Sequence, residues 1–223
     1  MKKIIGAIFI SLVTGLFYTT TAMSEMKMGI SAVGGLFNAA GAEKEANESN
    51  KASEEAAFVY GEVWIENSFD QGFSLGFGWV PHSLDTDVEE RTDVPLTAAG
   101  STDSGSTSDS GTNRAQADIE NLITVYATVP LMDTGFYAKL GVHHMDIISG
   151  ESLTTGSTYG NTDVFGGTIG LGYEHDAGNV FVRAEIGASA WEEISLLSQT
   201  NSDNQVTADV EGITARISIG KAF

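Results

Sequence analysis

Short and long connections alternate along this chain, and the segments between them carry an apolar residue at every second position. The short connections are NSFDQG (67–72), PLMDTG (130–135) and EHDAGN (174–179). The long connections cover about 39–55, 83–116, 148–161 and 192–205. Three short turns and four long loops join eight strands, and an up-and-down sheet that closes on itself places all the short turns at one rim. The rhythm therefore predicts an all-β fold, an eight-stranded antiparallel up-and-down transmembrane β-barrel.

Charged and aliphatic residues occupy opposite faces of the predicted strands. In the second strand Val63 and Ile65 alternate with Glu62 and Glu66, and successive side chains on a strand point to opposite faces. A soluble barrel of the lipocalin kind has the same connectivity, but it keeps its charged face in water and lines its interior with apolar residues. The aromatic residues of the aliphatic face favour the membrane barrel, because they gather at two levels, as interfacial girdles do. They are Phe73, Phe136, Tyr173 and Phe223 near the short turns, and Trp79 and Phe165 near the long loops.

The first 22 residues have the pattern of a secretory signal peptide. Lys2 and Lys3 precede an apolar stretch from Ile4 to about Tyr18, and small residues follow as far as Ala22. A transmembrane helix is the weaker interpretation, because the apolar run is shorter than the roughly 20 residues that a bilayer requires. We therefore expect a signal peptide over 1–22 and a single outer-membrane barrel domain over 23–223.

Composition limits how this barrel is held together and what it binds. The chain has no cysteine, so closure of the sheet rather than cross-linking must stabilise it. Its formal charge is −19, and removal of residues 1–22, with Lys2 and Lys3 as their only charges, leaves −21. Nucleic acid is excluded as a partner, since binding phosphates requires clustered basic residues.

The carboxyl-terminal segment ITARISIGKAF (213–223) completes a resemblance that covers the whole mature chain. Together with the signal peptide and the alternation of short and long connections, this segment gives the chain a resemblance to the OmpA-type transmembrane domain and to the OmpX-like and opacity-type barrels. The resemblance implies a bacterial outer-membrane location, with outer-membrane lipid and lipopolysaccharide as neighbours. It also implies that Phe223 is part of the signal read by the outer-membrane assembly machinery. Lys221 departs from the pattern, because these barrels usually have an apolar or aromatic residue there.

Six charged residues of the inner face are predicted to form an interior network with zero net charge. Isolated ions in so narrow a lumen are costly to desolvate, so these side chains should pair with one another or with trapped water. One interpretation is a structural plug, because eight-stranded barrels have room for little besides side chains. The other is a gated ion path, since inner glycines such as Gly76, Gly78, Gly170 and Gly172 leave space. The six residues are Glu62, Glu120, Lys139, Arg183, Glu185 and Arg216.

Two histidine motifs are candidates for a metal site or a catalytic site. His143 and His144, followed by Asp146, suggest a metal site, but adjacent strand residues face opposite ways, so only His143 should see the lumen. His82-Ser83 invites comparison with lipid A deacylases, although neighbouring residues do not place the base within reach of the hydroxyl. The sequence therefore assigns no catalytic, cofactor or metal residue and favours a protein that is not an enzyme.

The long loops are acidic and of low complexity, and segments of this kind are typical of a solvated, charge-repelling surface. The clearest are GAEKEANESNKASEE (41–55), LDTDVEERTD (84–93) and AAGSTDSGSTSDSGTN (98–113). We expect a non-enzymatic barrel with a role in envelope structure or in surface contact through these loops. A narrow or gated pore for small solutes is the alternative, and an enzyme acting on outer-membrane lipid is the third hypothesis. The sequence names no extracellular partner.

Overall fold

The computed structural model of the chain describes residues 23–45, 48–70, 72–93, 111–153, 158–200 and 204–223. The predicted signal peptide, 1–22, lies outside the described residues. None of the described residues forms a helix that is long and apolar enough to cross a bilayer. The strands are β1 (Met23–Glu45), β2 (Glu48–Phe69), β3 (Ser74–Trp79), β4 (Leu84–Asp85), β5 (Glu89–Asp93), β6 (Gly111–Pro130), β7 (Phe136–Ser152), β8 (Thr162–Ala177), β9 (Val180–Trp191), β10 (Ile194–Leu197) and β11 (Gln205–Ala222).

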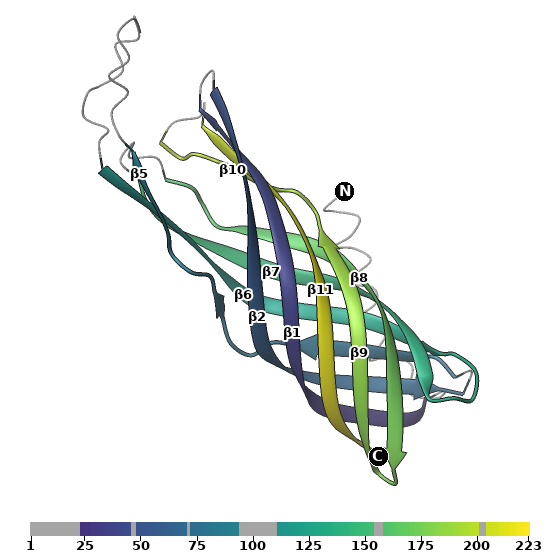
Figure 1. Cartoon of the computed structure of the whole chain (residues 1–223). Coiled ribbons are helices and arrows are strands. Elements are labelled where there is room, and N and C mark those ends of the chain that lie inside the picture. The colour runs from purple at the N-terminus through teal and green to yellow at the C-terminus, as the bar shows by residue number, and fades with distance from the viewer. Residues whose placement is uncertain (1–22, 46–47, 71, 94–110, 154–157, 201–203) are drawn as a thin grey trace, which may run out of the picture.

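Eight of these strands form a closed antiparallel ring, as the sequence predicts (Figure 1). Around the ring the order is β1, β2, β3, β6, β7, β8, β9 and β11, and β11 pairs back onto β1 from Lys27↔Ala222 to Lys44↔Gln205. Closure leaves no free edge along most of the wall, which is what a bilayer demands of a β-structure.

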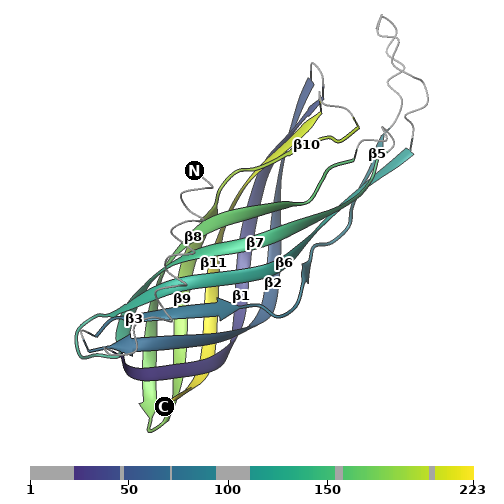
Figure 2. The ribbon, with the colours of Figure 1, turned by 180° about the vertical axis from the view of Figure 1, so that it is seen from behind.

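The short turns lie at one end of the molecule together with the carboxyl terminus, and β5 and β10 lie at the other end (Figures 1 and 2). The three turns carry Gly72, Gly135 and Gly178 with φ of 87°, 82° and 77°. Residues that carry a side chain rarely adopt this left-handed backbone conformation, whereas glycine adopts it at no steric cost. The predicted turns at 67–72, 130–135 and 174–179 are therefore confirmed.

The prediction of long loops is wrong in part, because much of each loop is paired strand. In the predicted loop 39–55, the described residues 39–45 and 48–55 are paired strand, from Ala39↔Glu54 to Glu45↔Glu48. Segment 83–116 includes β4, β5 and the start of β6, segment 148–161 includes the end of β7, and segment 192–205 includes β10. Hydrogen bonds between strands pair the backbone N–H and C=O groups of polar residues as well as those of apolar residues. The strands can therefore continue beyond the point where the alternation of apolar residues ends.

A β-bulge in β6 changes the facing of the residues above it. The β6–β7 register shifts between Glu120 and Ile123, and Asn121 within the bulge has φ of 51°. An extra residue reverses the alternation, so that Ile119 lines the interior cavity while Glu120 is exposed. The predicted inward position of Glu120 is therefore wrong.

The outer surface of the ring is a broad apolar belt. Its residues include Ile30, Leu36, Val59, Phe136, Leu140, Ile169, Leu171, Ile186, Ile213, Ile217 and Phe223, each more than half exposed. An apolar surface this extensive requires lipid to cover it. Of the six aromatic residues predicted to form girdles, Trp79, Phe136, Tyr173 and Phe223 are exposed on it. The described residues thus form a small β-barrel with an apolar outer face. Its buried core lies inside the ring, toward the β5 end, and consists of Val33, Tyr60, Val80, Leu84, Leu122, Met145, Ile147 and Val164.

Candidate functional site

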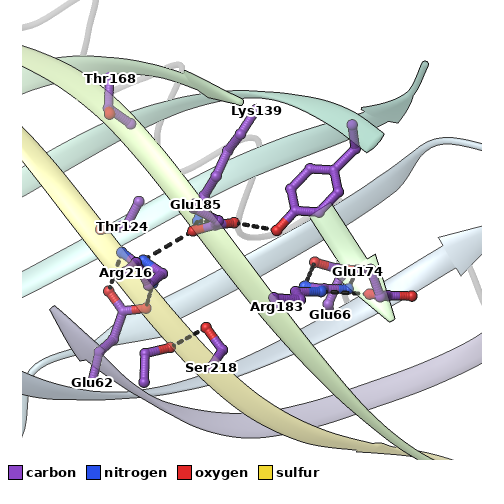
Figure 3. Close-up of polar contacts among 12 residues, drawn as sticks. Glu62, Glu66, Thr124, Lys139, Thr168, Glu174, Arg183, Glu185, Arg216 and Ser218 are labelled. Atoms are coloured by element: carbon purple, nitrogen blue, oxygen red, sulfur yellow. Dashed lines mark hydrogen bonds and ion pairs between the residues drawn. The ribbon is translucent and has the colours of Figure 1, made fainter. Parts of the chain in front are cut away.

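Two ion-paired groups cross the lumen of the barrel (Figure 3). The first joins Glu62 on β2, Arg216 on β11, Glu185 on β9 and Lys139 on β7. Arg216 forms two hydrogen bonds with the Glu62 carboxylate, and its Nε lies 3.0 Å from Glu185 Oε2. Lys139 Nζ lies 3.1 Å from the same Glu185 oxygen, and the Tyr137 hydroxyl donates to the other oxygen at 2.7 Å. Two acids and two bases make this group neutral.

The second group lies closer to the short turns and is centred on Arg183. Its guanidinium donates two bonds to Glu66, at 2.9 and 2.8 Å, and a third through Nε to Glu174. Lys27 Nζ binds Glu174 at 2.6 Å and lies 3.5 Å from the half-exposed Glu25. The carboxylate of Glu66 is fully buried, so its charge depends on Arg183 for compensation.

Five of the six residues predicted for the interior network do belong to these groups. Arg183 is separate from the other four, and Glu120 is absent because of the β6 bulge. Sequence reasoning missed Glu66, Glu174 and Lys27 as partners. Glu66 shares the strand parity of Glu62, so alternation along β2 was a sufficient signal to find it.

Tyrosine rings occupy the space that the inner glycines open. A Cβ on Gly76 would collide with the ring of Tyr126, and a Cβ on Gly172 would collide with the ring of Tyr137. Lys139 Nζ lies 4.1 Å from the centroid of the Tyr126 ring, within the range of a cation–π contact. Gly76 and Gly172 therefore make room for aromatic side chains, and these tyrosines lie beside the ion-paired groups inside the lumen.

A cavity of about 750 Å³ lies above the first ion-paired group. Lys139, Glu185 and Arg216 form its floor, and apolar side chains such as Phe37, Phe58, Leu122, Ile147 and Trp191 form its walls. We use the name outer cavity for this space. Polar side chains also contribute to the lining, among them Thr124, Thr168 and Ser189. Sequence reasoning missed the outer cavity, because it depends on the inward turn of residues above the bulge and on strands predicted as loops.

The two adjacent histidines face opposite ways, as predicted. His143 lines the outer cavity, where its Nδ1 lies 2.8 Å from Thr124 Oγ1 and its ring stacks on Trp191 at 5.7 Å. His144 contacts the ring of Phe165 at 4.8 Å on the other face. In the described part of the chain, no three histidine or carboxylate side chains converge in a way that could hold a metal ion.

His82 and Ser83 are both exposed, in the segment that follows β3. His82 Nδ1 lies 2.9 Å from the backbone oxygen of Ser83, and its Nε2 faces the Gly61 amide at 3.4 Å. Both ring nitrogens thus contact the backbone rather than the serine hydroxyl. The geometry lacks the base-to-nucleophile contact that activates a serine.

The last strand ends at Phe223 on the lipid-facing surface. The Phe223 amide donates to the Met26 carbonyl at 2.9 Å, which fixes the terminus to β1, and the ring is 61% exposed. Lys221 Nζ lies 4.9 Å from the centroid of that ring. The lysine that departs from the family pattern therefore packs against the terminal aromatic ring.

No model of a known protein family and no curated protein sequence matches this chain. Among solved structures, it is similar to the attachment invasion locus protein Ail of Yersinia pestis, with 12% identity and a TM-score of 0.35 over 87% of this chain and 99% of that one. It is similar to the outer membrane protease OmpT of Escherichia coli, with 12% identity and a TM-score of 0.47 over 92% and 99%. Neisserial surface protein A has 10% identity and a TM-score of 0.31 over 82% and 95%.

Proposed function

We propose that this protein is a non-enzymatic outer-membrane barrel with a role in envelope structure or in surface contact through its acidic extracellular end. The observation that carries the proposal is the two ion-paired groups inside the lumen, beneath strands that project beyond the apolar belt. Charges that are paired with one another inside the lumen favour a structural role over a conducting path, and the projecting paired strands offer a surface for contact. Outer-membrane lipid and lipopolysaccharide are its proposed neighbours, and the outer-membrane assembly machinery its proposed partner during insertion.

The β1–β2 hairpin is the main part of that platform. Above Leu36 and Val59, the last large residues of the belt on these strands, β1 and β2 remain paired as far as Glu45 and Glu48. Eight residues from 38 to 45, at about 3.3 Å each, extend the hairpin by roughly 26 Å. Segment 41–55 carries five glutamates and two lysines, so the projecting end is acidic. A paired hairpin presents these side chains in a fixed order, which suits contact with a surface.

The pore hypothesis is tested by conductance. Purified protein in planar bilayers should give no more current than lipid alone, because the floor charges are paired and Tyr126 and Tyr137 fill the space beside them. Steady channels in the wild type would contradict the proposal and support the pore for small solutes. The matched variant is Arg216→Ala with Glu62→Ala, which removes one pair without changing the net charge and should raise leakage.

The surface role is tested by shortening the hairpin. Replacement of residues 41–52 by a two-residue Asn-Gly turn keeps the ring intact, because pairing below Phe37↔Ala56 is untouched. The shortened protein should assemble at wild-type levels but reduce attachment of cells to surfaces or weaken the envelope against detergent. A control with Glu43, Glu54 and Glu55 changed to Gln keeps the length and removes the charge. Wild-type attachment and envelope resistance in both variants would contradict the proposal.

A further inference from the structure

The barrel wall has a gap between β2 and the segment that follows β3. β3 ends at Trp79, and its pairing with β2 covers only Val63 to Ser68. Beyond Trp79 the chain follows β6 instead, since β4 and β5 both pair with β6. Among the described residues, no strand pairs with the free side of β2 above Val63. Figures 1 and 2 show the β5–β6 end separating from the β1–β2 end.

The lining of the outer cavity includes residues from both sides of this gap in the backbone pairing. Its lining takes Phe58 and Tyr60 from the β2 side, and Leu84, Thr86 and Ile119 from the opposite side. A volume of about 750 Å³ lies within the range of roughly 300 to 1,000 Å³ that is usual for small-molecule sites. Walls rich in aliphatic and aromatic groups favour a ligand with an apolar body.

The charges around the outer cavity favour a cation over an anion. Lys139 is the only lysine and Arg216 the only arginine among its described lining, and both are bound to carboxylates in the floor. The acidic lining residues lie toward the extracellular end and are exposed, so they remain accessible to a ligand. They are Glu54, Glu55, Asp85, Asp87 and Glu89. Since charges concentrated at the mouth of an apolar cleft raise the local concentration of the opposite ion, this mouth attracts cations.

We propose that the outer cavity binds amphipathic cations, with the apolar body between β2 and β6 and the positively charged group at the acidic mouth. The exposed acidic residues of the lining lie at the outer end of the cavity, so such a molecule enters there. The ion-paired floor below limits how deep the apolar body reaches. This site is independent of the proposed surface role, and its failure would leave that role untouched.

The test uses the full barrel in phosphatidylcholine nanodiscs and Trp191 as the reporter. Trp191 lines the outer cavity, whereas Trp64 and Trp79 do not, so the variant Trp64→Phe, Trp79→Phe isolates its fluorescence. Dodecyltrimethylammonium should change that fluorescence in a saturable way. Dodecyl sulfate should bind at least about tenfold more weakly, because several carboxylates face its charge. Equal binding of the two amphiphiles, or no saturable change with either, would overturn the proposal.

Variants separate the cavity from nonspecific partition into lipid. Asp85→Asn with Asp87→Asn should weaken dodecyltrimethylammonium binding about fivefold, since two charges at the mouth are lost. Asp176→Asn, an exposed acid at the opposite rim, should leave binding unchanged. Ala117→Trp fills the cavity and should abolish binding. Unchanged affinity in the double mouth variant, or an equal loss in Asp176→Asn, would overturn the assignment even if the cavity-filled protein fails to assemble.

Discussion

Arg183 on β9 and Glu66 on β2 share two parallel hydrogen bonds inside the barrel, of 2.9 and 2.8 Å, although they lie 117 residues apart in the sequence. Such bidentate pairs are geometrically specific as well as strong. Since the two strands are not neighbours in the ring, the pair links parts of the wall that no backbone ladder joins. The second ion-paired group therefore connects separate parts of the barrel wall across the lumen.

Removal of the Arg183–Glu66 ion pair should lower the stability of the barrel. Arg183→Ala leaves the buried carboxylate of Glu66 without its partner and also removes a bond to Glu174, so the free energy of unfolding should fall by about 3 kcal/mol or more. Urea unfolding in lipid vesicles, followed by the mobility shift between folded and unfolded barrel, measures this change.

Arg114→Ala is the matched control, because Arg114 also pairs with a glutamate, Glu90, but both side chains are more than half exposed. Its cost should remain below about 1 kcal/mol. Equal stability of the two variants would contradict the inward placement of the charges.

A glycine-to-alanine substitution should reduce the stability of the barrel at an inner position and change it little at an outer position. Gly76→Ala places a Cβ against the ring of Tyr126, which must shift together with Lys139 above it, so we expect a loss of about 1 to 3 kcal/mol. A Cβ on Gly34 meets nothing within 4 Å, so Gly34→Ala should change stability little. The same unfolding experiment compares them, and a larger loss for Gly34→Ala would show that the two faces are assigned the wrong way round.

The terminal aromatic residue should matter more for assembly than for stability. Deletion of Phe223 removes a largely exposed ring and two backbone hydrogen bonds with Met26, so little buried area is lost. We nevertheless expect less heat-modifiable protein in the outer membrane, because the last residue is part of the proposed assembly signal. Phe136→Ala removes an exposed aromatic residue from the same rim and leaves the terminus intact. Normal membrane levels after the deletion would contradict that role for Phe223.

The alternation of apolar residues and of short and long connections was enough to predict the eight-stranded ring. Side-chain parity along β2 and β11 places Glu62 and Arg216 inside and Ile65 and Ile217 outside, and it depends only on the geometry of a strand. The prediction failed at Glu120 because a bulge reverses parity, and nothing in a two-residue repeat marks where an extra residue enters.

Partners across the lumen are harder to predict than faces. Parity places Glu66 and Arg183 on the inner surface, but which acid meets which base depends on strand tilt and on the stagger of the closed ring. The outer cavity was also beyond sequence reasoning, since it requires the gap left where the chain departs from β2 after Trp79. The polar composition of 83–116 predicted a loop, although most of the described residues in this segment belong to strands of the sheet.

The central claim is that the charged face lies inside and the aliphatic face lies in lipid, and its most direct test uses two of the three tryptophans. Trp79 is 42% exposed on the outer face, whereas Trp64 is 6% exposed inside, next to Arg183. Two variants, each keeping one of these residues with the other two tryptophans changed to Phe, are folded into vesicles of lipid with brominated acyl chains. Fluorescence of the variant that keeps Trp79 should be strongly quenched, and that of the variant that keeps Trp64 should be nearly unaffected. Strong quenching of Trp64 with little quenching of Trp79 would show that the faces are reversed and would contradict the account.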